Sequence, residues 1–245
     1  MPRTRLHISE SVDVNAAVEL DADKARYLHR VLRLHVGDVV TVFDGLGSEY
    51  SATIATIGKS SATLRVGAKT ESVTESSLRV HLVQGISRGE RMDFVVQKAT
   101  ELGVKRISPV LTEFGVVKLN ATRAEKRRDH WQKVSASACE QSGRVRLPLI
   151  DTPVPLNHWF GNKPAQVDTE IILQPGAPTP LVRVGRPETK LCLLVGSEGG
   201  FSNIELEDAE IAGFRPVSLG PRVLRTETAA VAALAVLQAL WGDLR

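Results

Sequence analysis

From about residue 78 onward, the sequence alternates short apolar runs with helix-like segments, and this alternation restricts the possible folds more than any other feature. The apolar runs are LRVHLVQG, KRISPVLT, TEIILQP, KLCLLVGSEGG and FRPVSLG, and the chain ends in the helix-like TETAAVAALAVLQALWGDL. Continuous apolar strands separated by helices are typical of a sheet that is covered on both faces. We therefore expect an α/β domain with a largely parallel sheet.

The first seventy residues follow a different pattern, in which strands predominate. Residues 39–45 and 49–58 are rich in β-branched side chains and flank a glycine-containing turn, which predicts a hairpin, and residues 61–68 predict a third strand. One helix is expected within DADKARYLHRVLRL, capped by Asp21 or Asp23. Its apolar stripe would consist of Leu28, Val31 and Leu32. Short strands with one helix predict a small β-barrel.

A polar segment without aromatic residues, AKTESVTESS at residues 68–77, is the expected linker between the two parts. We place a first domain at residues 1–72 and a second at residues 73–245.

The composition excludes several classes of protein. The two cysteines are far apart and lack neighbouring ligands, so we expect neither a disulfide framework nor a metal site. No apolar run reaches membrane-spanning length without a charge, and the first residues lack the apolar core of a signal peptide. We expect a cytoplasmic protein. The net charge of +3 permits a nucleic-acid partner without demanding one.

Two glycine-containing loops, each between an apolar strand and a helix, are the candidates for chemistry. Ligands of open α/β sheets bind at the carboxyl ends of strands, so both loops could face one crevice. In VGSEGGFSNIE, Gly196, Gly199 and Gly200 allow sharp bends or close approach to a ligand, and Ser202 with Glu205 predicts a capping box. The spacing fits neither a P-loop nor a Rossmann fingerprint. A purely structural turn remains the alternative.

The second loop, VSLGPRVLRTETA, contains apolar residues that could line a pocket for a flat ring, namely Leu219, Val223 and Leu224. Its Gly-Pro pair fixes a bend. Taken alone, Glu227 could simply complement the helix dipole, Thr226 could be an N-cap, and Arg225 could be in a surface ion pair.

Together, VGSEGGFSNIE, SLGPRVLRTETA and the terminal apolar helix resemble the SPOUT superfamily of S-adenosylmethionine-dependent RNA methyltransferases. The match is to the bacterial 16S ribosomal RNA uridine-N3 methyltransferase family. HRVLRLHVGDVVTVFDG, KATELGVKRISPV and ACEQSGRVRLP extend the resemblance over nearly the whole chain. One departure is LTEFGVVK, where the family usually has Arg-Ser and this chain has Phe114-Gly115.

The resemblance implies a PUA-like β-barrel that binds RNA, followed by an α/β domain with a C-terminal trefoil knot. It implies methylation of N3 of a specific uridine in 16S ribosomal RNA, with S-adenosylmethionine as cofactor and a homodimer as the working unit. The partner would be the RNA or the assembled small subunit, with no membrane and no metal. The implied cofactor-binding residues are Leu173, Gly196, Glu198, Gly199, Gly200, Leu219, Gly220, Pro221, Arg222, Val223 and Leu224.

Two residues of the second loop are candidates for catalysis. N3 must lose its proton before it can attack, and an arginine can stabilise the negative charge that develops on the base. We assign this role to Arg225, and we assign the role of base to Glu227 or to a path through water.

Candidate phosphate contacts come from arginines in several places along the chain. Arg26, Arg30 and Arg33 have the spacing of one helix face. The other candidates are Arg3, Arg5 and Arg144, and a further basic cluster lies at residues 123–128. Each cluster could also be only a solvated face. Tyr27, His29, Phe114 and Trp131 are candidates for stacking on an unstacked target base.

The terminal helix supplies a separate argument for a dimer. Between Thr228 and Trp241, only Thr228 and Gln238 are polar, and a helix that is apolar all round must be buried all round. A partner subunit would cover the face that its own sheet leaves free.

Three alternatives remain open. The chain could be an RNA-binding module with a vestigial cofactor site, or a nucleotide enzyme of the doubly wound type. It could also be a SPOUT enzyme that methylates another base or a ribose 2′-OH, because the loops specify the cofactor better than the acceptor.

Overall fold

The computed structural model describes residues 4–9, 13–72, 74–163 and 167–244, and the chain forms two compact units. The first comprises residues 1–75 with 139–147, and the second comprises residues 76–138 with 148–245. The division after Glu75 lies near the boundary expected after residue 72, whereas no local pattern predicts the return of 139–147 to the first unit. Helix α3 (Ala121–Ser142) contributes residues to both units.

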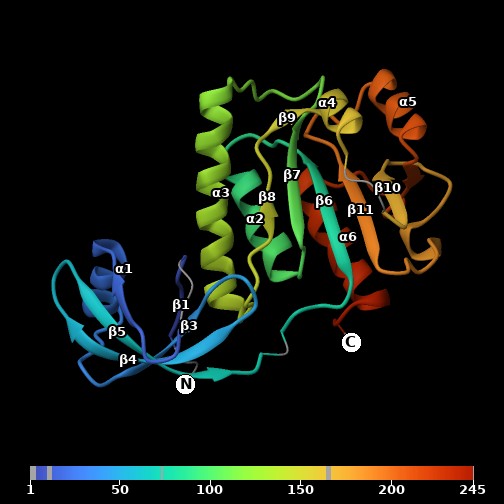
Figure 1. The fold of residues 1–245 in the computed structure, drawn as a ribbon. Coiled ribbons are helices and arrows are strands. Elements are labelled where there is room, and N and C mark those ends of the chain that lie inside the picture. The colour runs from blue at the N-terminus through green and yellow to red at the C-terminus, as the bar shows by residue number, and fades with distance from the viewer. Residues whose placement is uncertain (1–3, 10–12, 73, 164–166, 245) are drawn as a thin grey trace. The chain divides into compact units, whose positions relative to one another are not determined.

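The first unit is built on a five-stranded curled sheet (Figure 1). Its strands are β1 (Arg5–His7), β2 (Ala17–Leu20), β3 (Val39–Phe43), β4 (Glu49–Ile57) and β5 (Ala62–Thr70), in the order β1-β3-β4-β5-β2. The expected hairpin is β3–β4, and Asp44 shapes its turn by accepting the backbone N–H groups of Leu46, Gly47 and Ser48. The sheet forms a PUA-like half-barrel, in agreement with the small PUA-like β-barrel that we expected.

The expected helix of the first unit is shorter and less regular than its sequence indicates. Asp21 caps α1 (Ala22–Arg26) by accepting the Lys24 N–H, as one of the two proposed caps. The chain then continues as a π-helical turn, η1 (Tyr27–Val31). This wider turn leaves Leu28 buried but Val31 66% exposed, so the prediction that Val31 belongs to the apolar stripe was wrong.

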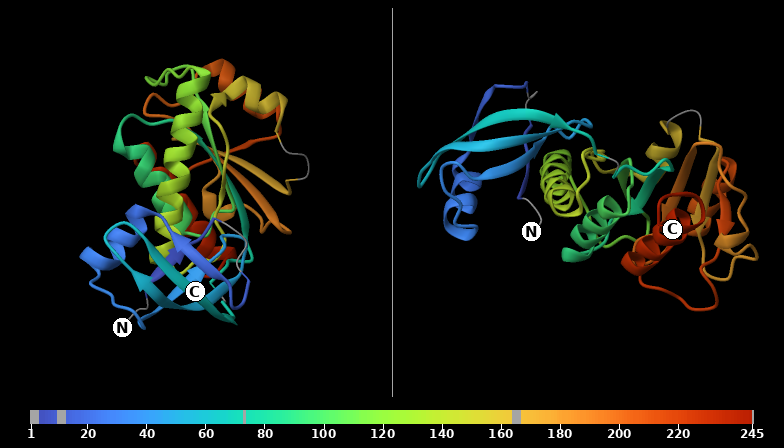
Figure 2. Two further views of the ribbon diagram at one scale, coloured as in Figure 1. Left: turned by 60° about the vertical axis from the view of Figure 1, so that its left-hand side comes forward. Right: turned by 90° about the horizontal axis from the view of Figure 1, so that it is seen from below.

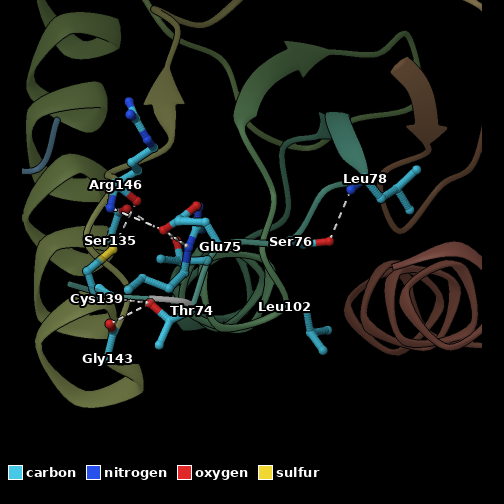
Figure 3. Close-up of polar contacts among 12 residues, drawn as sticks. Thr74, Glu75, Ser76, Leu78, Leu102, Ser135, Cys139, Gly143 and Arg146 are labelled. Atoms are coloured by element: carbon cyan, nitrogen blue, oxygen red, sulfur yellow. Dashed lines mark hydrogen bonds and ion pairs between the residues drawn. The ribbon is translucent and has the colours of Figure 1, made fainter. Parts of the chain in front are cut away.

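The segment expected to be a free linker is held to the first unit by specific contacts (Figure 3). Strand β5 already includes residues 68–70. The Thr74 hydroxyl donates to the Gly143 carbonyl at 2.8 Å, and Glu75 forms an ion pair with Arg144 at 3.0 Å. Glu75 also accepts the backbone N–H of Arg146 at 3.1 Å. These contacts attach residues 143–146 to the same unit.

The second unit contains a seven-stranded sheet in which all pairs are parallel, as predicted. Its strands are β6 (Arg79–Gly85), β7 (Arg106–Leu111), β8 (Leu149–Ile150), β9 (Val154–Pro155), β10 (Thr169–Leu173), β11 (Lys190–Val195) and β12 (Arg215–Val217). The order is β12-β10-β11-β6-β7-β8, with β9 also paired to β7. Neighbouring strands β10 and β11 therefore end at the same edge.

Helices cover both faces of this sheet, which explains why its strands are apolar on both sides. The helices are α2 (Glu90–Glu101), α4 (Leu156–Gly161), α5 (Asn203–Ile211) and α6 (Thr226–Trp241), with a short 3₁₀ turn, η2 (Leu181–Arg183). Leu191 and Leu193 of β11 pack in the core that includes α2 and α6, which lie together on one face (Figure 2). Cys192 and Leu194 pack in the core that includes α4 and α5.

The C-terminal part of the second unit forms the trefoil knot expected for a SPOUT-type domain. After β12, Ser218 accepts the Leu181 N–H and donates its own N–H to the Thr179 carbonyl, both at 2.9 Å. These two partners lie in the loop that joins β10 to β11. The segment after β12 therefore lies directly against that loop before α6 begins.

A partly buried polar network joins β6 and β7 to the residue that follows β8 in the second unit. The His81 ring and the Ser108 hydroxyl are 2.7 Å apart, and Ser108 donates to Asp151, which also forms two hydrogen bonds with Arg106. Burial, together with the nearby Arg106 charge, lowers the pKa of His81 to about 4, although Asp151 opposes the shift. Trp159 packs edge-on against the His81 ring. His81 is therefore neutral in the folded protein at physiological pH.

We expect this histidine to make the second unit sensitive to acid. Below its ordinary pKa of 6.5, the unfolded chain binds a proton that folded His81 does not bind until about pH 4. The unfolding free energy should therefore fall as the pH decreases through this window, by about 2 kcal/mol between about pH 7 and pH 4.5. The Asn variant, H81N, cannot take up this proton and should lose that part of the decrease.

The measurement is urea unfolding of wild type and H81N at both pH values. An equal decrease in both proteins would show that His81 does not carry this proton linkage.

Candidate functional site

One cavity of ≈ 620 Å³ lies in the second unit, where the loops after β10, β11 and β12 come together. Its lining comes from Leu173–Pro175, from the segment Val195–Phe201 with Leu206, from Val217, Leu219, Gly220 and residues 222–227 with Ala229, and from Arg91 of α2. This volume falls in the usual range for small-molecule sites. The two glycine loops that the sequence singled out thus face the same space.

The glycines of the first loop allow unusually close backbone packing. Gly200 has a φ of +72° and closes a turn by donating its N–H to the Ser197 carbonyl. A Cβ on Gly199 would lie 2.6 Å from Phe114. On β6, a Cβ on Gly85 would lie 2.3 Å from the Ser197 nitrogen. The loop can therefore lie directly on the ends of β6 and β7 only because these positions lack side chains.

A buried hydrogen-bond node joins the start of α6 to this loop. The Thr226 hydroxyl donates to the Gly196 carbonyl at 2.5 Å and accepts from the Gln84 side-chain amide at 3.0 Å. The N-cap of α6 is Arg225, so the prediction of Thr226 as a possible N-cap was wrong. The Thr226 hydroxyl donates to the Gly196 carbonyl of the other loop instead of capping its own helix. Sequence reasoning also missed Gln84, which has no recognisable motif around it.

The expected capping box is present at the start of α5. Ser202 accepts the Glu205 N–H, and the Glu205 carboxylate accepts the Ser202 N–H. Glu205 also accepts the Glu113 N–H at 2.8 Å, and the hydroxyls of Thr112 and Ser197 are 2.8 Å apart. The loop after β7 is therefore fastened to the glycine loop.

Glu198 is held by two groups at the N-terminal end of α2. Its Oε1 accepts the Arg88 N–H at 2.9 Å and a guanidinium N–H of Arg91 at 3.0 Å. Burial opposes ionisation, but these hydrogen bonds outweigh it and hold the pKa of Glu198 below its ordinary value. Glu198 is thus a carboxylate in the cavity wall, and it also fixes the position of Arg91.

The two candidate catalytic residues, Arg225 and Glu227, both line the cavity. Arg225 is exposed, whereas Glu227 is partly buried. The Glu227 Oε2 atom is buried, and no described residue forms a hydrogen bond with it. A buried carboxylate oxygen without a partner is costly, so the cavity is suited to a ligand that brings a positive charge or an N–H donor.

The structure brings nearly all of the expected cofactor-binding residues to this cavity. Ten of the eleven line it, and the exception is Pro221, which lies exposed in the same loop outside the lining. Arg91, Phe201 and Leu206 also line it and were not expected. Arg91 could have been suspected only from the strand–loop–helix pattern around it.

The expected RNA-binding arginines are in very different environments. Arg144 is only 2% exposed and is paired with Glu75, so its predicted contact with RNA is corrected to a structural role. The Arg5 side chain is 15% exposed, pairs with Glu49 and donates to the Arg144 carbonyl, which indicates a structural role as well. Arg3 lies outside the described residues.

The other three expected RNA-binding arginines, Arg26, Arg30 and Arg33, are exposed. Arg26 lies in α1 and Arg30 in the π-helical turn, but Arg33 follows the helix with a φ of +55°. The helical spacing that grouped the three residues therefore does not extend to Arg33, because the helix ends before it.

The candidate stacking residues also differ in accessibility. Trp131 is 1% exposed and donates its indole N–H to Asp93 at 3.0 Å, so its predicted role in stacking was wrong. Tyr27 and Phe114 are 47% and 52% exposed, and His29 is exposed as well. Phe114 packs on Gly199, so the position of the missing family arginine lies beside the glycine loop.

Two further features are absent from the described residues, namely a metal-binding cluster and a membrane-spanning helix. Within them, no three His, Cys, Asp or Glu side chains are placed to hold a metal ion. None of the described helices is long and apolar enough to cross a membrane.

Comparisons with known proteins agree with this architecture. Residues 74–238 match the family model described as an RNA methyltransferase domain, and residues 20–67 match the one described as an RNA methyltransferase PUA domain. The chain is 35% identical to ribosomal RNA small subunit methyltransferase E of Buchnera aphidicola, over 98% of this chain and 95% of the relative.

Solved structures extend the likeness to the whole fold. Ribosomal RNA small subunit methyltransferase E from Neisseria gonorrhoeae, bound to S-adenosyl methionine, has a TM-score of 0.92 and 37% identity, covering 99% of this chain and 100% of that one. A Legionella pneumophila protein, solved with the bound cofactor SAM, has a TM-score of 0.93 and 38% identity, with 100% of both chains covered. The chain therefore belongs to the ribosomal RNA small subunit methyltransferase E family.

Proposed function

We propose that this protein transfers a methyl group from S-adenosylmethionine to N3 of a specific uridine in 16S ribosomal RNA. The observation that carries the proposal is the cavity that the loops after β10, β11 and β12 line together, with Arg225 and Glu227 both in its wall. The acceptor is the RNA itself or the assembled small subunit. A ribosomal RNA substrate implies that the enzyme acts in the cytoplasm.

The residues present fit this cofactor. S-adenosylmethionine carries a sulfonium and an ammonium group, and the cavity wall offers the Oε2 of Glu227, to which no described residue donates a hydrogen bond. The adenine ring would lie between Leu219 and Leu224, while backbone groups of residues 196–200 and 219–224 read its edge. When bound, the cofactor supplies a methyl group on a positively charged sulfur.

Arg225 would act on the target base. The uridine N3 becomes nucleophilic when its proton leaves, and the negative charge then spreads onto O2 and O4. A guanidinium placed at one of these oxygens stabilises that charge without reorganisation. Arg225 is exposed at the wall of the cavity and immediately precedes α6, which fixes its backbone.

Glu227 would accept the N3 proton, directly or through a water molecule. It lies in the first turn of α6 and lines the cavity. The two charged side chains, Arg225 and Glu227, come from the same turn, so one backbone geometry positions the charge stabiliser and the base together.

A homodimer is the proposed working unit. The buried face of α6 includes Ala230, Ala233, Leu234 and Leu237. On another face, apolar residues remain partly or fully exposed, namely Val231, Ala232, Ala235 and Ala239. A second copy of the chain would cover this apolar stripe, which follows the helical period.

The function is tested by incubating the purified protein with S-adenosylmethionine and either 16S ribosomal RNA or small subunits from a strain that lacks the corresponding gene. We expect 3-methyluridine to appear at one position, as measured by nucleoside mass spectrometry and primer extension. A methyl group on another base or on a ribose would identify a different acceptor and contradict the proposal.

Replacing Arg225 with alanine, R225A, should lower kcat much more than it changes the affinity for the cofactor. Loss of one donor to a developing negative charge typically lowers the rate about 100- to 1000-fold. Calorimetry with S-adenosylmethionine should give an affinity within about threefold of wild type, because the other loop residues remain. The matched control is R215A, which removes an exposed cation from β12 outside the cavity. A rate for R225A close to that of R215A would remove Arg225 from the mechanism.

The dimer is tested by placing a charge on the exposed stripe of α6, as in A235R. Burying an arginine in an apolar interface is costly, so light scattering should show a change from twice the chain mass to the chain mass. V14R, on an exposed residue of the first unit, is the control and should keep the wild-type mass. If wild type already has the mass of one chain, the proposed dimer does not exist.

A further inference from the structure

A second hollow in the second unit is bounded by positive charge. We name it the basic cleft. It has a volume of ≈ 890 Å³. Its ionisable lining side chains are Arg88, Lys118, Arg123, Lys126, Arg127 and His130. The described residues that line it include no aspartate or glutamate. A concentration of one charge sign destabilises a fold by self-repulsion, so it calls for an anionic partner.

Three cations of α3, Arg123, Lys126 and Arg127, form a regular stripe together with His130, whose ring is 2.7 Å from an Asp93 carboxylate oxygen. The four residues are spaced at i, i+3, i+4 and i+7, which places them on one face of the helix. The adjacent face, with Ala124, Trp131 and Ser135, is buried. The stripe faces the cleft because the adjacent face of the helix is anchored in the core.

These charges are available to a ligand. All of the five arginines and lysines of the cleft are exposed. Among the described residues, no carboxylate forms an ion pair with Lys118, Arg123, Lys126 or Arg127. By contrast, Arg128 of the same helix pairs with Asp129 and donates to Thr152, and it does not line the cleft.

The basic cleft is joined to the cavity described above by direct contacts. Arg88 lines the cleft, and its backbone N–H donates to Glu198 in the cavity wall. The chain just before the cleft-lining residues 116–119 is held to the glycine loop through Thr112 with Ser197 and through Phe114 on Gly199. If an RNA strand binds in the cleft, the nucleotide that follows the bound stretch would therefore lie beside the cavity.

We propose that the basic cleft binds the phosphodiester backbone of the substrate RNA next to the target uridine. This inference rests on the proposed methyltransferase function and adds to it a second RNA contact surface, which lies outside the first unit. Residues 123 to 130 extend about 10 Å along the helix axis, so the stripe can face more than one successive phosphate. Contacts of this kind position an RNA without reading its sequence.

The test compares two double variants that remove equal charge from the same unit. The cleft variant is K126Q/R127Q, and the control variant is K133Q/R215Q, whose two side chains are exposed outside the cleft. Binding to purified 16S ribosomal RNA and to assembled small subunits is measured at several salt concentrations. Thermal melting and calorimetry with S-adenosylmethionine verify that each variant is folded and keeps its cofactor site.

We expect the cleft variant to bind the RNA about five- to tenfold more weakly and the control variant to bind within about twofold of wild type. The slope of log Kobs against log salt should become shallower by about one to two for the cleft variant. The reason is that binding releases fewer counterions from the RNA when fewer phosphates are contacted. In methylation assays, KM for the RNA should rise while kcat is retained.

Two outcomes would overturn the proposal. One is an equal loss of RNA affinity in both variants, with the same salt slope, which would reflect net charge alone. The other is a loss confined to assembled subunits with naked RNA unaffected, which would assign the cleft to a ribosomal protein. Binding is measured without methyl transfer, so failure of wild type to form 3-methyluridine would contradict the proposed function separately.

Discussion

The geometry of the site depends on the partly buried contact between the Thr226 hydroxyl and the Gly196 carbonyl. Gln84 completes it from the end of β6, so three segments that are far apart in the sequence meet at one hydroxyl. Such an interaction is most valuable where water is excluded, because each group would otherwise be buried without a partner. It ties the first turn of α6 to the loop after β11, and the knot loops can then enclose a cavity.

The charges of the site follow from this attachment. Arg225 and Glu227 flank Thr226, so fixing one hydroxyl fixes the backbone of both charged residues. Gly85 and Gly199 permit the same approach from the other side, since a Cβ at either position would overlap neighbouring atoms. The knot therefore brings the loops together, and Gly85 and Gly199 allow their backbones to come into contact. The Thr226 hydrogen bonds then fix the position of one loop relative to the other.

The sequence predicted the parts of this arrangement that have local signals. Parallel strands, the capping box of Ser202 with Glu205 and the two glycine loops follow from short patterns, and they were found. Resemblance then placed both loops around one ligand. Local patterns could not show that Thr226 prefers a distant carbonyl to its own helix, nor that Gln84 lies beneath it. They also could not separate Arg144, buried against Glu75, from arginines that face solvent, because charge alone does not report burial.

Helix α3 shows what the structure adds to the basic cluster that the sequence indicated at residues 123–128. Its sequence is basic throughout the stretch 123–128, and a run of charge usually marks a solvated face. In the structure the basic residues of this stretch have different environments. Arg128 is paired with Asp129, whereas Lys126 and Arg127 face the basic cleft. The same helix buries Trp131, which anchors the cationic stripe at a fixed angle. A stripe so anchored, joined to the glycine loop through the residues after β7, has the rigidity that positioning a polymer requires.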